Sequence, residues 1–406
     1  MRLLYVCPDP SVRPGGRGGG FTTHMEEMIR SFKRLGHDVT VLDSKTGPEP
    51  AQGGIEDRTA KRMPRTVRVL LRDVLYLLHN VKFYARLARL LRQDSRFDFM
   101  YERCIFYQFA TVIAARRWKI PLILEFNASL DEMRLTDGLG LRPLAALIEK
   151  HVVSRAGAVV TVSGVLKKYL VGLGVPAERV IVLHNAVDLD RFSPSVSGAA
   201  VRRRFLFSPE QVLVGFVGGF SVWHRAHLLI DVAPVVIGMN KSVRFLMVGG
   251  REGNPRFEDF RRRVCALGLA EIFHFAGEVP RDKVPDHIAA MDIAVIPWAT
   301  DYGSPMKTFE YMGMARALVA PRVPALEEVL EHGENAMLVP PGDVKEIATA
   351  IADLAGDPLL RRTLGQNARR AVEQKYNWNM NASATLEVAA ALMKAKPGRV
   401  SNRPGA

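Results

Sequence analysis

Short apolar runs alternate with longer segments of helical periodicity along most of this 406-residue chain. This alternation is typical of βαβ units, which build a parallel sheet with helices packed on its faces. The candidate strands fall into two series of six, at Leu3–Val6, Val39–Leu42, Phe99–Tyr101, Leu122–Phe126, Ala158–Val162 and Val180–Leu183, then at Val212–Val217, Phe245–Val248, Ile272–Phe275, Ile293–Ile296, Leu318–Ala320 and Met337–Val339. Two such series predict an α/β fold with two similar, doubly wound domains rather than one oversized sheet.

The domain boundary is expected in the polar, loop-rich passage at residues 185–209. Residues 1–184 then form an N-terminal domain and residues 185–375 a C-terminal domain. A final helix, residues 376–394, has no strand of its own, so we expect it to join the N-terminal domain and pack across the pair. Residues 395–406 are rich in Pro, Gly and Arg and are expected to be a disordered tail.

Composition points to a globular protein of a reducing compartment. A hydrophobic content of 48% and a charged content of 24% are ordinary for a globular chain. Cys7, Cys104 and Cys265 lie far apart and form no CxxC pair, so a disulfide framework or a zinc site is not expected. The apolar start is too brief for a secretory signal, and no run reaches the roughly 18 apolar residues of a spanning helix. We therefore expect a cytoplasmic protein.

Positive charge is concentrated in residues 58–96, where eleven Lys or Arg stand against two Asp, out of a net charge of +14 for the chain. One basic stripe comprises Arg68, Arg72, His79, Lys82, Arg86 and Arg89, and apolar residues fill the other sides of the helix expected at 67–91. Such a helix can lie on an anionic membrane surface or can bury its leucines within a domain. We expect no nucleic-acid partner, because no recognition motif or interleaved aromatic residues accompany the charge.

The most informative local motif is residues 302–312, which follow the apolar strand Ile293–Ile296. A turn there leads into a helix whose first N–H groups attract phosphate. Lys307 adds a positive charge, and Glu310, one turn on, can accept hydrogen bonds from ribose hydroxyls. An ordinary helix start with solvated charges is the alternative. The residues assigned to this nucleotide-sugar site are Gly303, Ser304, Pro305, Met306, Lys307 and Glu310.

A second candidate ligand loop is Gly15–Gly20, which follows the first strand. Its spacing does not match a dinucleotide fingerprint, but its glycines allow a ligand to approach the backbone closely. Gly18, Gly19 and Gly20 are therefore assigned to the same site, with a flexible surface loop as the alternative. Open α/β sheets bind ligands beyond the carboxyl ends of their strands, so we expect the site in a cleft between the two domains.

Many short motifs, in this order and spacing, resemble the GT-B glycosyltransferases of family 4, which are retaining enzymes that use nucleotide-sugars. The matching stretches are Gly19–His24, Leu35–Val41, Tyr101–Arg103, Leu124–Ala128, Val162–Ser163, His184–Asp188, Arg191–Pro194, Phe216–Gly218, Val248–Gly250, Phe275–Val279, Met291–Ala294, Ser304–Met312, His332–Asn335 and Leu338–Asp343. The resemblance covers nearly the whole chain.

The resemblance implies that the C-terminal domain holds the nucleotide-sugar. Glu310 corresponds to the ribose-binding second carboxylate of the family's Glu-x7-Glu motif, while the first carboxylate is replaced by Tyr302. The Arg and Lys that hold the diphosphate in this family are replaced by Gly219 and His224. We therefore expect Lys307, Arg225 and the helix start to carry more of the phosphate charge. Gly218, next to this loop, is included in the site.

The resemblance also implies that the N-terminal domain presents the acceptor. Asn127 aligns with a residue that faces the donor sugar, and it is grouped with Glu125 and Lys307 as the catalytic set. The residues assigned to the acceptor side are His24, Glu102, Arg103 and Glu132. The alternatives are a strand-end charge for Glu125, a local salt bridge between Glu102 and Arg103, and a cap on the glycine loop for His24.

These observations predict a retaining glycosyltransferase that needs no metal and no other cofactor. The expected donor is a nucleotide-diphosphate sugar, and the expected acceptor is a saccharide or lipid-linked saccharide of the cell envelope. The basic helix would place the enzyme on the inner face of the plasma membrane. Other GT-B chemistry, as in a nucleotide-sugar epimerase or a phosphorylase, stays open, as does a non-catalytic scaffold in a polysaccharide assembly complex.

Overall fold

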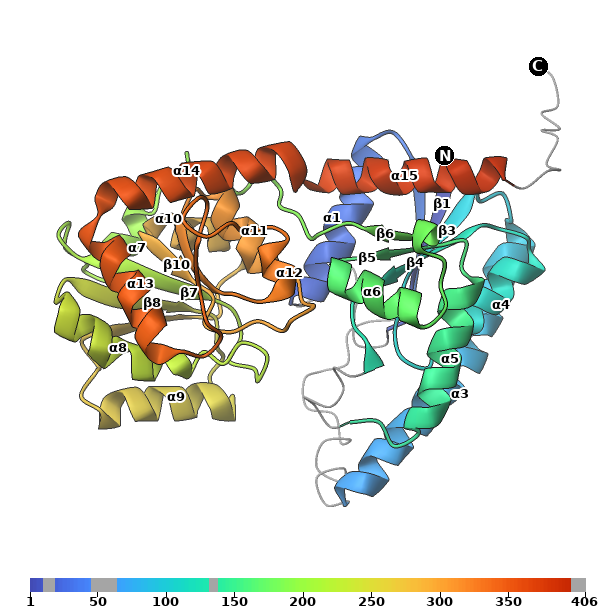
Figure 1. Ribbon diagram of the computed structural model, residues 1–406. Helices are drawn as coiled ribbons and strands as arrows, with labels where there is room; N and C mark the ends of the chain where they lie inside the picture. Colours follow the sequence, from blue (N-terminus) through green and yellow to red (C-terminus); the bar gives the residue numbers. More distant parts are fainter. Residues whose placement is uncertain (10–18, 45–63, 131–137, 396–406) are drawn as a thin grey trace. The chain divides into compact units, whose positions relative to one another are not determined.

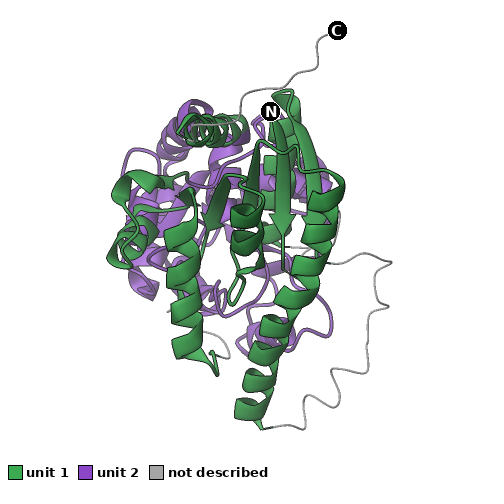
Figure 2. Ribbon diagram, turned by 90° about the vertical axis from the view of Figure 1, so that its right-hand side faces the viewer, with its two compact units in different colours: residues 1–183, 379–406 green, residues 184–378 purple. Residues whose placement is uncertain are grey.

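The computed structural model describes residues 1–9, 19–44, 64–130 and 138–395. Two compact units make up the chain (Figure 2). Unit 1 comprises Met1–Leu183 with Asn379–Ala406, and unit 2 comprises His184–Trp378. The expected boundary after residue 184 lies one residue from this division. Except for Ala395, the tail expected to be disordered lies outside the described residues.

Unit 1 is built on a parallel sheet with the strand order β2-β1-β3-β4-β5-β6. Its strands are β1 (Arg2–Cys7), β2 (Asp38–Asp43), β3 (Phe99–Arg103), β4 (Leu122–Phe126), β5 (Ala158–Thr161) and β6 (Val180–Val182). All six strands predicted for this half are confirmed, with small differences at their ends. The order changes direction at β1, so the loops after β1 and β3 open at the edge where such sheets bind ligands.

Helices cover both faces of this sheet (Figure 1). They are α1 (Gly20–Arg34), α3 (Arg65–Gln93), α4 (Ala110–Arg117), α5 (Arg142–Arg155), α6 (Gly164–Gly172), the short 3-10 helix η2 (Ala177–Arg179) and α15 (Trp378–Lys394). Helices α3, α4 and α5 lie side by side on one face (Figures 1 and 2). Helix α15 packs against unit 1, because a Cβ at Gly157 would lie 2.9 Å from Leu392 Cδ1.

Not all of the basic stripe expected on α3 is free to bind a membrane. Two of its arginines make contacts within unit 1. Arg72 donates a hydrogen bond to the Gly138 carbonyl at 2.5 Å. Arg86 lies 3.9 Å from the carboxylate of Asp43. The Gly138 carbonyl and the carboxylate of Asp43, at the end of β2, thus partly compensate the charges of these two arginines.

Unit 2 repeats the plan with the strand order β12-β11-β10-β7-β8-β9, again parallel. Its strands are β7 (Val212–Val217), β8 (Val243–Val248), β9 (Phe273–Gly277), β10 (Ile293–Val295), β11 (Ala317–Pro321) and β12 (Met337–Val339). Its helices are α7 (Ala199–Arg204), α8 (Leu228–Met239), α9 (Pro255–Ala266), η3 (Arg281–Lys283), α10 (Val284–Ala290), α11 (Met306–Gly313), α12 (Pro324–Glu327), α13 (Val344–Gly356) and α14 (Pro358–Lys375). The six strands predicted here are also confirmed, whereas α14 was not predicted.

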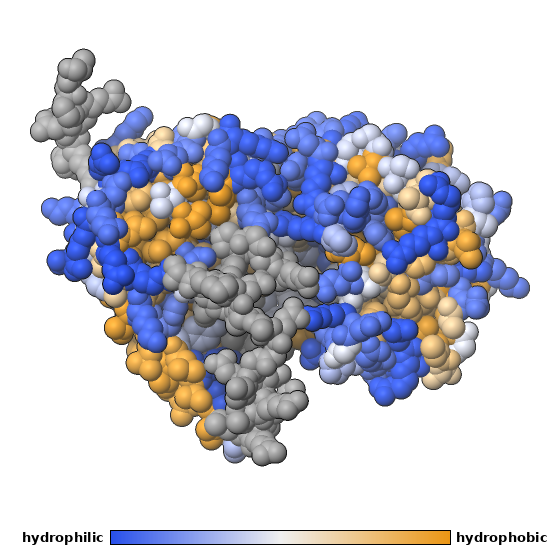
Figure 3. All heavy atoms as spheres, turned by 180° about the vertical axis from the view of Figure 1, so that it is seen from behind, coloured by the Kyte–Doolittle hydropathy of each residue, from blue (hydrophilic) through white to orange (hydrophobic). Residues whose placement is uncertain are grey.

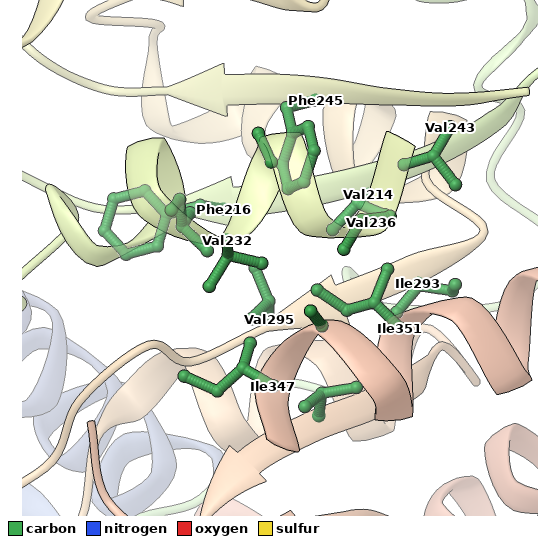
Figure 4. Close-up of a cluster of buried hydrophobic side chains, with 14 of the residues drawn as sticks. Val214, Phe216, Val232, Val236, Val243, Phe245, Ile293, Val295, Ile347 and Ile351 are labelled. Carbon is green, nitrogen blue, oxygen red and sulfur yellow. The ribbon is translucent and has the colours of Figure 1, made fainter. Parts of the chain in front are cut away.

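The unit 2 sheet is buried on both faces, so its strands read as continuous apolar runs. Val214 and Phe216 of β7 pack into a core with α8 and α13 (Figure 4). Leu213 precedes Val214 in the same strand. Adjacent residues of a strand point to opposite faces of the sheet, so Leu213 belongs to the core on the other face. Because β7, β8 and β10 run parallel, their carboxyl ends lie at one edge of this sheet.

Candidate functional site

The candidate donor site lies at this edge of unit 2, where α11 begins after the loop from β10. Helix α11 starts at Met306, and the Pro305 side chain gives no capping hydrogen bond. The first N–H groups of a helix carry a partial positive charge that suits an anionic ligand. The structure thus confirms a helix start at the predicted place.

Lys307 is the cation of this site. Its side chain is only 8% exposed, and its ammonium lies 4.3 Å from the centre of the Phe216 ring. Burial lowers the pKa of Lys307 to about 7, although the nearby carboxylate of Glu310 opposes this shift. A buried ammonium beside a carboxylate one helical turn away is a costly arrangement, which is typical of functional sites.

Glycines let the loops after β7 and β8 come close to this ammonium. Gly218 has φ +151°, and a Cβ there would lie 2.6 Å from Lys307 Nζ. Gly249 has φ +111°, and a Cβ there would lie 2.3 Å from the Gly218 carbonyl oxygen. Both positions need glycine, because a side chain at either would collide with its neighbours. The backbone of both loops can therefore pack closely around the Lys307 ammonium.

The replaced diphosphate pair, Gly219 and His224, lies in the same loop. The Nδ1 atom of His224 lies 2.6 Å from the Gly219 carbonyl oxygen, so it donates a hydrogen bond to that oxygen. Burial, with the adjacent positive charge of Lys307, lowers the pKa of His224 to about 4. His224 is therefore neutral at pH 7, and Lys307 is the stronger anion partner of the two.

Arg225 is oriented by a neighbouring aromatic ring. Its guanidinium lies 3.6 Å from the centre of the Trp298 ring, and its backbone adopts φ +41°. A cation stacked on an indole is held in a defined place, with its N–H groups still directed in the plane. Its contact with phosphate stays a prediction.

Two hydrogen-bonded contacts fix α11 and its preceding loop. The hydroxyl of Tyr311 accepts a hydrogen bond of 2.7 Å from the Val217 backbone N–H. The side-chain amide of Asn185 donates to the Ser304 carbonyl at 2.5 Å, and its backbone N–H donates to the Ser304 hydroxyl. The sequence placed Asn185 only in the passage between the two domains, and it indicated no role for Tyr311.

Other contributors to this site were also missed. Phe216, Trp298 and Gly249 have no polar side chain that marks a ligand site in a sequence. The Gly249-Gly250 pair directly after a buried strand was the available signal, because consecutive glycines there permit a close backbone approach.

Unit 1 gathers a separate polar cluster around the carboxylate of Glu125 at the end of β4. Arg103 donates to Glu125 Oε1 at 2.6 Å, and His24 Nδ1 lies 3.1 Å from the same oxygen. Asn127 donates to this oxygen as well. Burial opposes the charge of Glu125, but contacts with His24, Arg103 and Asn127 outweigh it and lower its pKa. Burial lowers the pKa of His24 to about 4.

This cluster brings together four of the residues that were assigned to the two sides of the reaction. Glu125 is buried and held by its neighbours, which suits a positioning role better than proton transfer. Asn127 lies at the edge of the cluster, and its side-chain oxygen has no hydrogen-bond partner among the described residues. Arg103 also stacks at 4.8 Å over the ring of Phe21, an exposed residue of α1.

Glu102 is not part of this cluster. The alternative of a local salt bridge between Glu102 and Arg103 is wrong, because Arg103 pairs with Glu125 on the neighbouring strand. Adjacent residues of a strand point to opposite faces of a sheet, which separates the two side chains. Burial raises the pKa of Glu102 to about 8, with Thr111 beside it.

The glycine loop is described only in part. Gly19 accepts hydrogen bonds from the backbone of Thr22 and Thr23, and Gly20 is the first residue of α1. Gly18 and Glu132 lie outside the described residues. The cleft expected between the two domains stays a prediction.

The two Rossmann-like domains, each with a polar cluster at the carboxyl edge of its sheet, define the GT-B class of glycosyltransferases. The family model described as Glycosyltransferase Family 4 matches residues 18–191, and the model described as Glycosyl transferases group 1 matches residues 211–357. The chain belongs to glycosyltransferase family 4, and it is a glycosyltransferase of the GT-B fold.

Curated relatives match over nearly the whole chain. The D-inositol 3-phosphate glycosyltransferase of Kineococcus radiotolerans is 26% identical over 418 residues, covering 96% of this chain and 94% of that protein. The protein of the same name from Acidothermus cellulolyticus is 27% identical over 407 residues, covering 96% of this chain and 89% of that protein.

Solved structures share the fold. Sucrose-phosphate synthase from Thermosynechococcus elongatus has a TM-score of 0.74 at 18% identity, covering 98% of this chain and 100% of that chain. Anabaena Alr3699/HepE in complex with UDP has a TM-score of 0.70 at 18% identity, covering 96% of this chain and 100% of that chain.

Proposed function

We propose that this glycosyltransferase moves a sugar from a nucleotide-diphosphate sugar to a hydroxyl of a saccharide or lipid-linked saccharide, with retention of the anomeric configuration. The observation that carries the proposal is the buried ammonium of Lys307, enclosed by the Gly218 backbone and the start of α11. A Cβ at Gly218 would collide with this ammonium, so only backbone lies beside it. A buried cation with exposed backbone next to it suits a compact, highly charged anion such as a diphosphate.

The donor binds in unit 2 with its diphosphate at Lys307 and its ribose at Glu310. These side chains lie one turn apart on α11, so a nucleotide-diphosphate can reach both. Anabaena Alr3699/HepE, which shares the fold, has been solved with UDP and with UDP-glucose, and this supports a donor of the same chemical class.

In the proposed reaction, the acceptor hydroxyl oxygen attacks the anomeric carbon on the face that the diphosphate leaves. The bond from that carbon to the phosphate oxygen breaks, and the departing phosphate takes the hydroxyl proton. Lys307 and the α11 N–H groups stabilise the negative charge that develops on the leaving group. These groups supply the positive charge that a metal ion supplies in other phosphate chemistry, so we propose a metal-independent reaction.

Unit 1 presents the acceptor in this proposal. The cluster of Arg103, Glu125 and Asn127 offers charged and amide groups that suit a polyhydroxylated molecule. The curated relatives are named for D-inositol 3-phosphate, so a phosphorylated cyclitol is a second candidate acceptor. For a lipid-linked acceptor, the enzyme would act at the inner face of the plasma membrane, with α3 on its anionic surface.

The first test is nucleotide binding, measured as the rise in melting temperature with UDP, GDP or ADP. A ligand that binds only the folded protein raises its stability by RT ln(1+[L]/Kd). We expect a rise with one of these nucleotides and none with free ribose. The absence of a rise with all three would sink the proposed donor site.

The second test is turnover. A panel of nucleotide-sugars is incubated with the enzyme and either membrane extract, inositol phosphate or no acceptor, and products are identified by mass spectrometry. We expect a new glycoside only when an acceptor is present, with equal yield in a metal chelator. Conversion of the nucleotide-sugar without an acceptor would instead identify an epimerase.

A further inference from the structure

Helix α3 buries one face within unit 1 and carries an exposed apolar stripe on another. The covered face follows Val69, Asp73, Asn80, Phe83 and Leu87, which are all buried. An apolar stripe with the same heptad spacing begins two positions earlier and therefore lies roughly 200° away around the helix. Its members are Val67, Leu71, Val74, Leu78 and Val81.

This apolar stripe is exposed. Its five side chains are between 38% and 69% accessible, and Leu70 and Leu75 beside it are 44% and 57% accessible. Hydrophobic residues accordingly gather over α3 at the lower left of Figure 3. Seven exposed aliphatic side chains on one helix form a contiguous patch of a kind that marks an interaction site.

The charge around the stripe has a single sign. On α3, α4 and α5, every Asp and Glu is buried, namely Asp73 and Glu149. The exposed ionisable side chains of these helices are Arg65, Lys82, Arg89, Arg92, Arg116, Arg117, Arg142, Lys150 and Arg155, with His151. Apolar residues also reach the surface on α4 and α5, at Ile113, Leu144 and Leu147.

We propose that the apolar stripe of α3 inserts into the interfacial region of an anionic lipid bilayer, with the basic side chains of α3, α4 and α5 on the headgroups. The inference rests on the membrane contact proposed above and specifies its face and chemistry. It does not depend on the donor site.

A bilayer fits this surface better than a second copy of the chain. Two copies joined along the stripe would bring together two surfaces whose exposed charged residues are all basic, and like charges repel. Anionic headgroups attract the same residues, while the aliphatic side chains leave water.

The stripe also has the dimensions of an interfacial helix. From Val67 to Val81 it runs for about 21 Å at 1.5 Å per residue. Among the described residues, no helix combines the length and apolar character needed to cross a bilayer. An apolar stripe along one side of a helix, with basic residues beside it, suits a helix that lies along the membrane surface.

The experiment is flotation of the full chain with vesicles of phosphatidylcholine alone or of phosphatidylcholine and phosphatidylglycerol in equal parts. The wild-type protein is expected to float with the anionic vesicles only. Changing Leu71, Leu75 and Leu78 together to Ser should weaken this binding at least tenfold, at high salt as well as low salt. Lys82→Glu with Arg89→Glu should weaken it roughly tenfold at low salt.

Matched controls come from unit 2. Leu267, Leu359 and Met239 have similar exposures of 56%, 71% and 53%, so their joint change to Ser tests the loss of any three exposed apolar residues. Lys345→Glu with Lys375→Glu reverses two exposed charges elsewhere. Both controls should float like the wild type, and all variants should keep the thermal response to nucleotide.

Three outcomes would overturn the inference. One is a wild-type protein that does not bind anionic vesicles, and another is a serine variant that floats as well as the wild type. The third is a lipid-free dimer, measured by light scattering, that the serine changes split into monomers, since the stripe would then be an interface between copies. A normal response to nucleotide in these cases leaves the donor site standing.

Discussion

The Tyr311 hydroxyl accepts a 2.7 Å hydrogen bond from the Val217 backbone N–H, and this bond joins α11 to the end of β7. Tyr311 is fully buried within the unit 2 core. The bond fixes the distance between the helix that carries Lys307 and Glu310 and the loop that begins at Gly218. Both halves of the proposed diphosphate site are therefore positioned by one side chain.

Replacing Tyr311 by Phe should weaken both stability and nucleotide binding. The change keeps the ring but leaves the Val217 N–H without its acceptor, which costs about 1–3 kcal/mol. Guanidinium chloride unfolding and titration with UDP measure the two effects. Tyr376→Phe is the control, since its hydroxyl makes only a long, 3.4 Å contact at an exposed site. Equal behaviour of the two variants would contradict the positioning role.

Glu310→Ala should abolish the stabilisation by nucleotide while leaving the fold intact. The side chain is partly exposed on α11, so its loss creates no core cavity, but the ribose hydroxyls lose their acceptor. The measurement is the shift in melting temperature with saturating nucleotide. Glu346→Ala removes an exposed carboxylate near the start of α13 and should retain the full shift. A full shift in the Glu310 variant would remove this residue from the donor site.

Nucleotide affinity should fall as the pH rises through about 7. The pKa of Lys307 in the unliganded protein is about 7, and a bound diphosphate favours the ammonium form. Between pH 7 and the higher pKa in the complex, each pH unit should weaken binding up to about tenfold. Calorimetric titration with UDP from pH 6 to 9 tests this, and Lys307→Arg should flatten the profile because guanidinium stays charged.

The same pKa predicts the pH dependence of stability without ligand. The value for Lys307 is lowered on folding from 10.5 to about 7, so the unfolded chain binds more protons between these limits. The free energy of unfolding should therefore rise with pH across that window, through this group. Lys307→Met should remove this contribution and raise the melting temperature of the unliganded protein at pH 7. A lower melting temperature would show that the ammonium stabilises the fold.

Gly249→Ala should destabilise unit 2. The new Cβ would meet the Gly218 carbonyl oxygen at 2.3 Å, and the residue holds φ +111°, which L side chains rarely adopt. The backbone has to move, and we expect a loss of at least about 2 kcal/mol. Gly238→Ala, in α8 with open space around it, should instead stabilise by roughly 0.5–1 kcal/mol. Chemical denaturation of both variants gives the comparison.

Glu102→Gln should remove a pH-dependent loss of stability. Burial raises the pKa of Glu102 from 4.5 to about 8, so the folded chain binds more protons than the unfolded chain between these values. The free energy of unfolding therefore falls as the pH rises across this window. We expect the Gln variant to exceed the wild type in stability at pH 8. Unfolding at pH 5 and pH 8 checks this, and parallel profiles would refute it.

Much of the fold could be predicted because it depends on short-range patterns. Most of the strands among the described residues are apolar runs that stand out from the polar loops around them, and burial on both faces of a parallel sheet makes such runs continuous. The start of α11 was also predictable, since Pro305 follows a turn and cannot continue a strand ladder. Helix α14 was missed because it begins directly after α13, at Pro358, with no strand between them.

The partners of the site residues were less predictable. Arg103 stands next to Glu102 in the sequence but pairs with Glu125, which is brought beside it by the register of β3 and β4. Such pairings depend on how strands far apart in the chain align, and no local pattern records that alignment.

By itself, the sequence determined the two doubly wound domains and the helix start with Lys307 and Glu310, because periodicity and turn chemistry act over a few residues. Only the tertiary structure decided that Lys307 lies buried over Phe216 and that the outer face of α3 is apolar as well as basic. The physical reason is that burial belongs to the packed chain. A lysine or a leucine carries the same covalent chemistry in every environment, and only its neighbours in space fix its charge and its exposure to water.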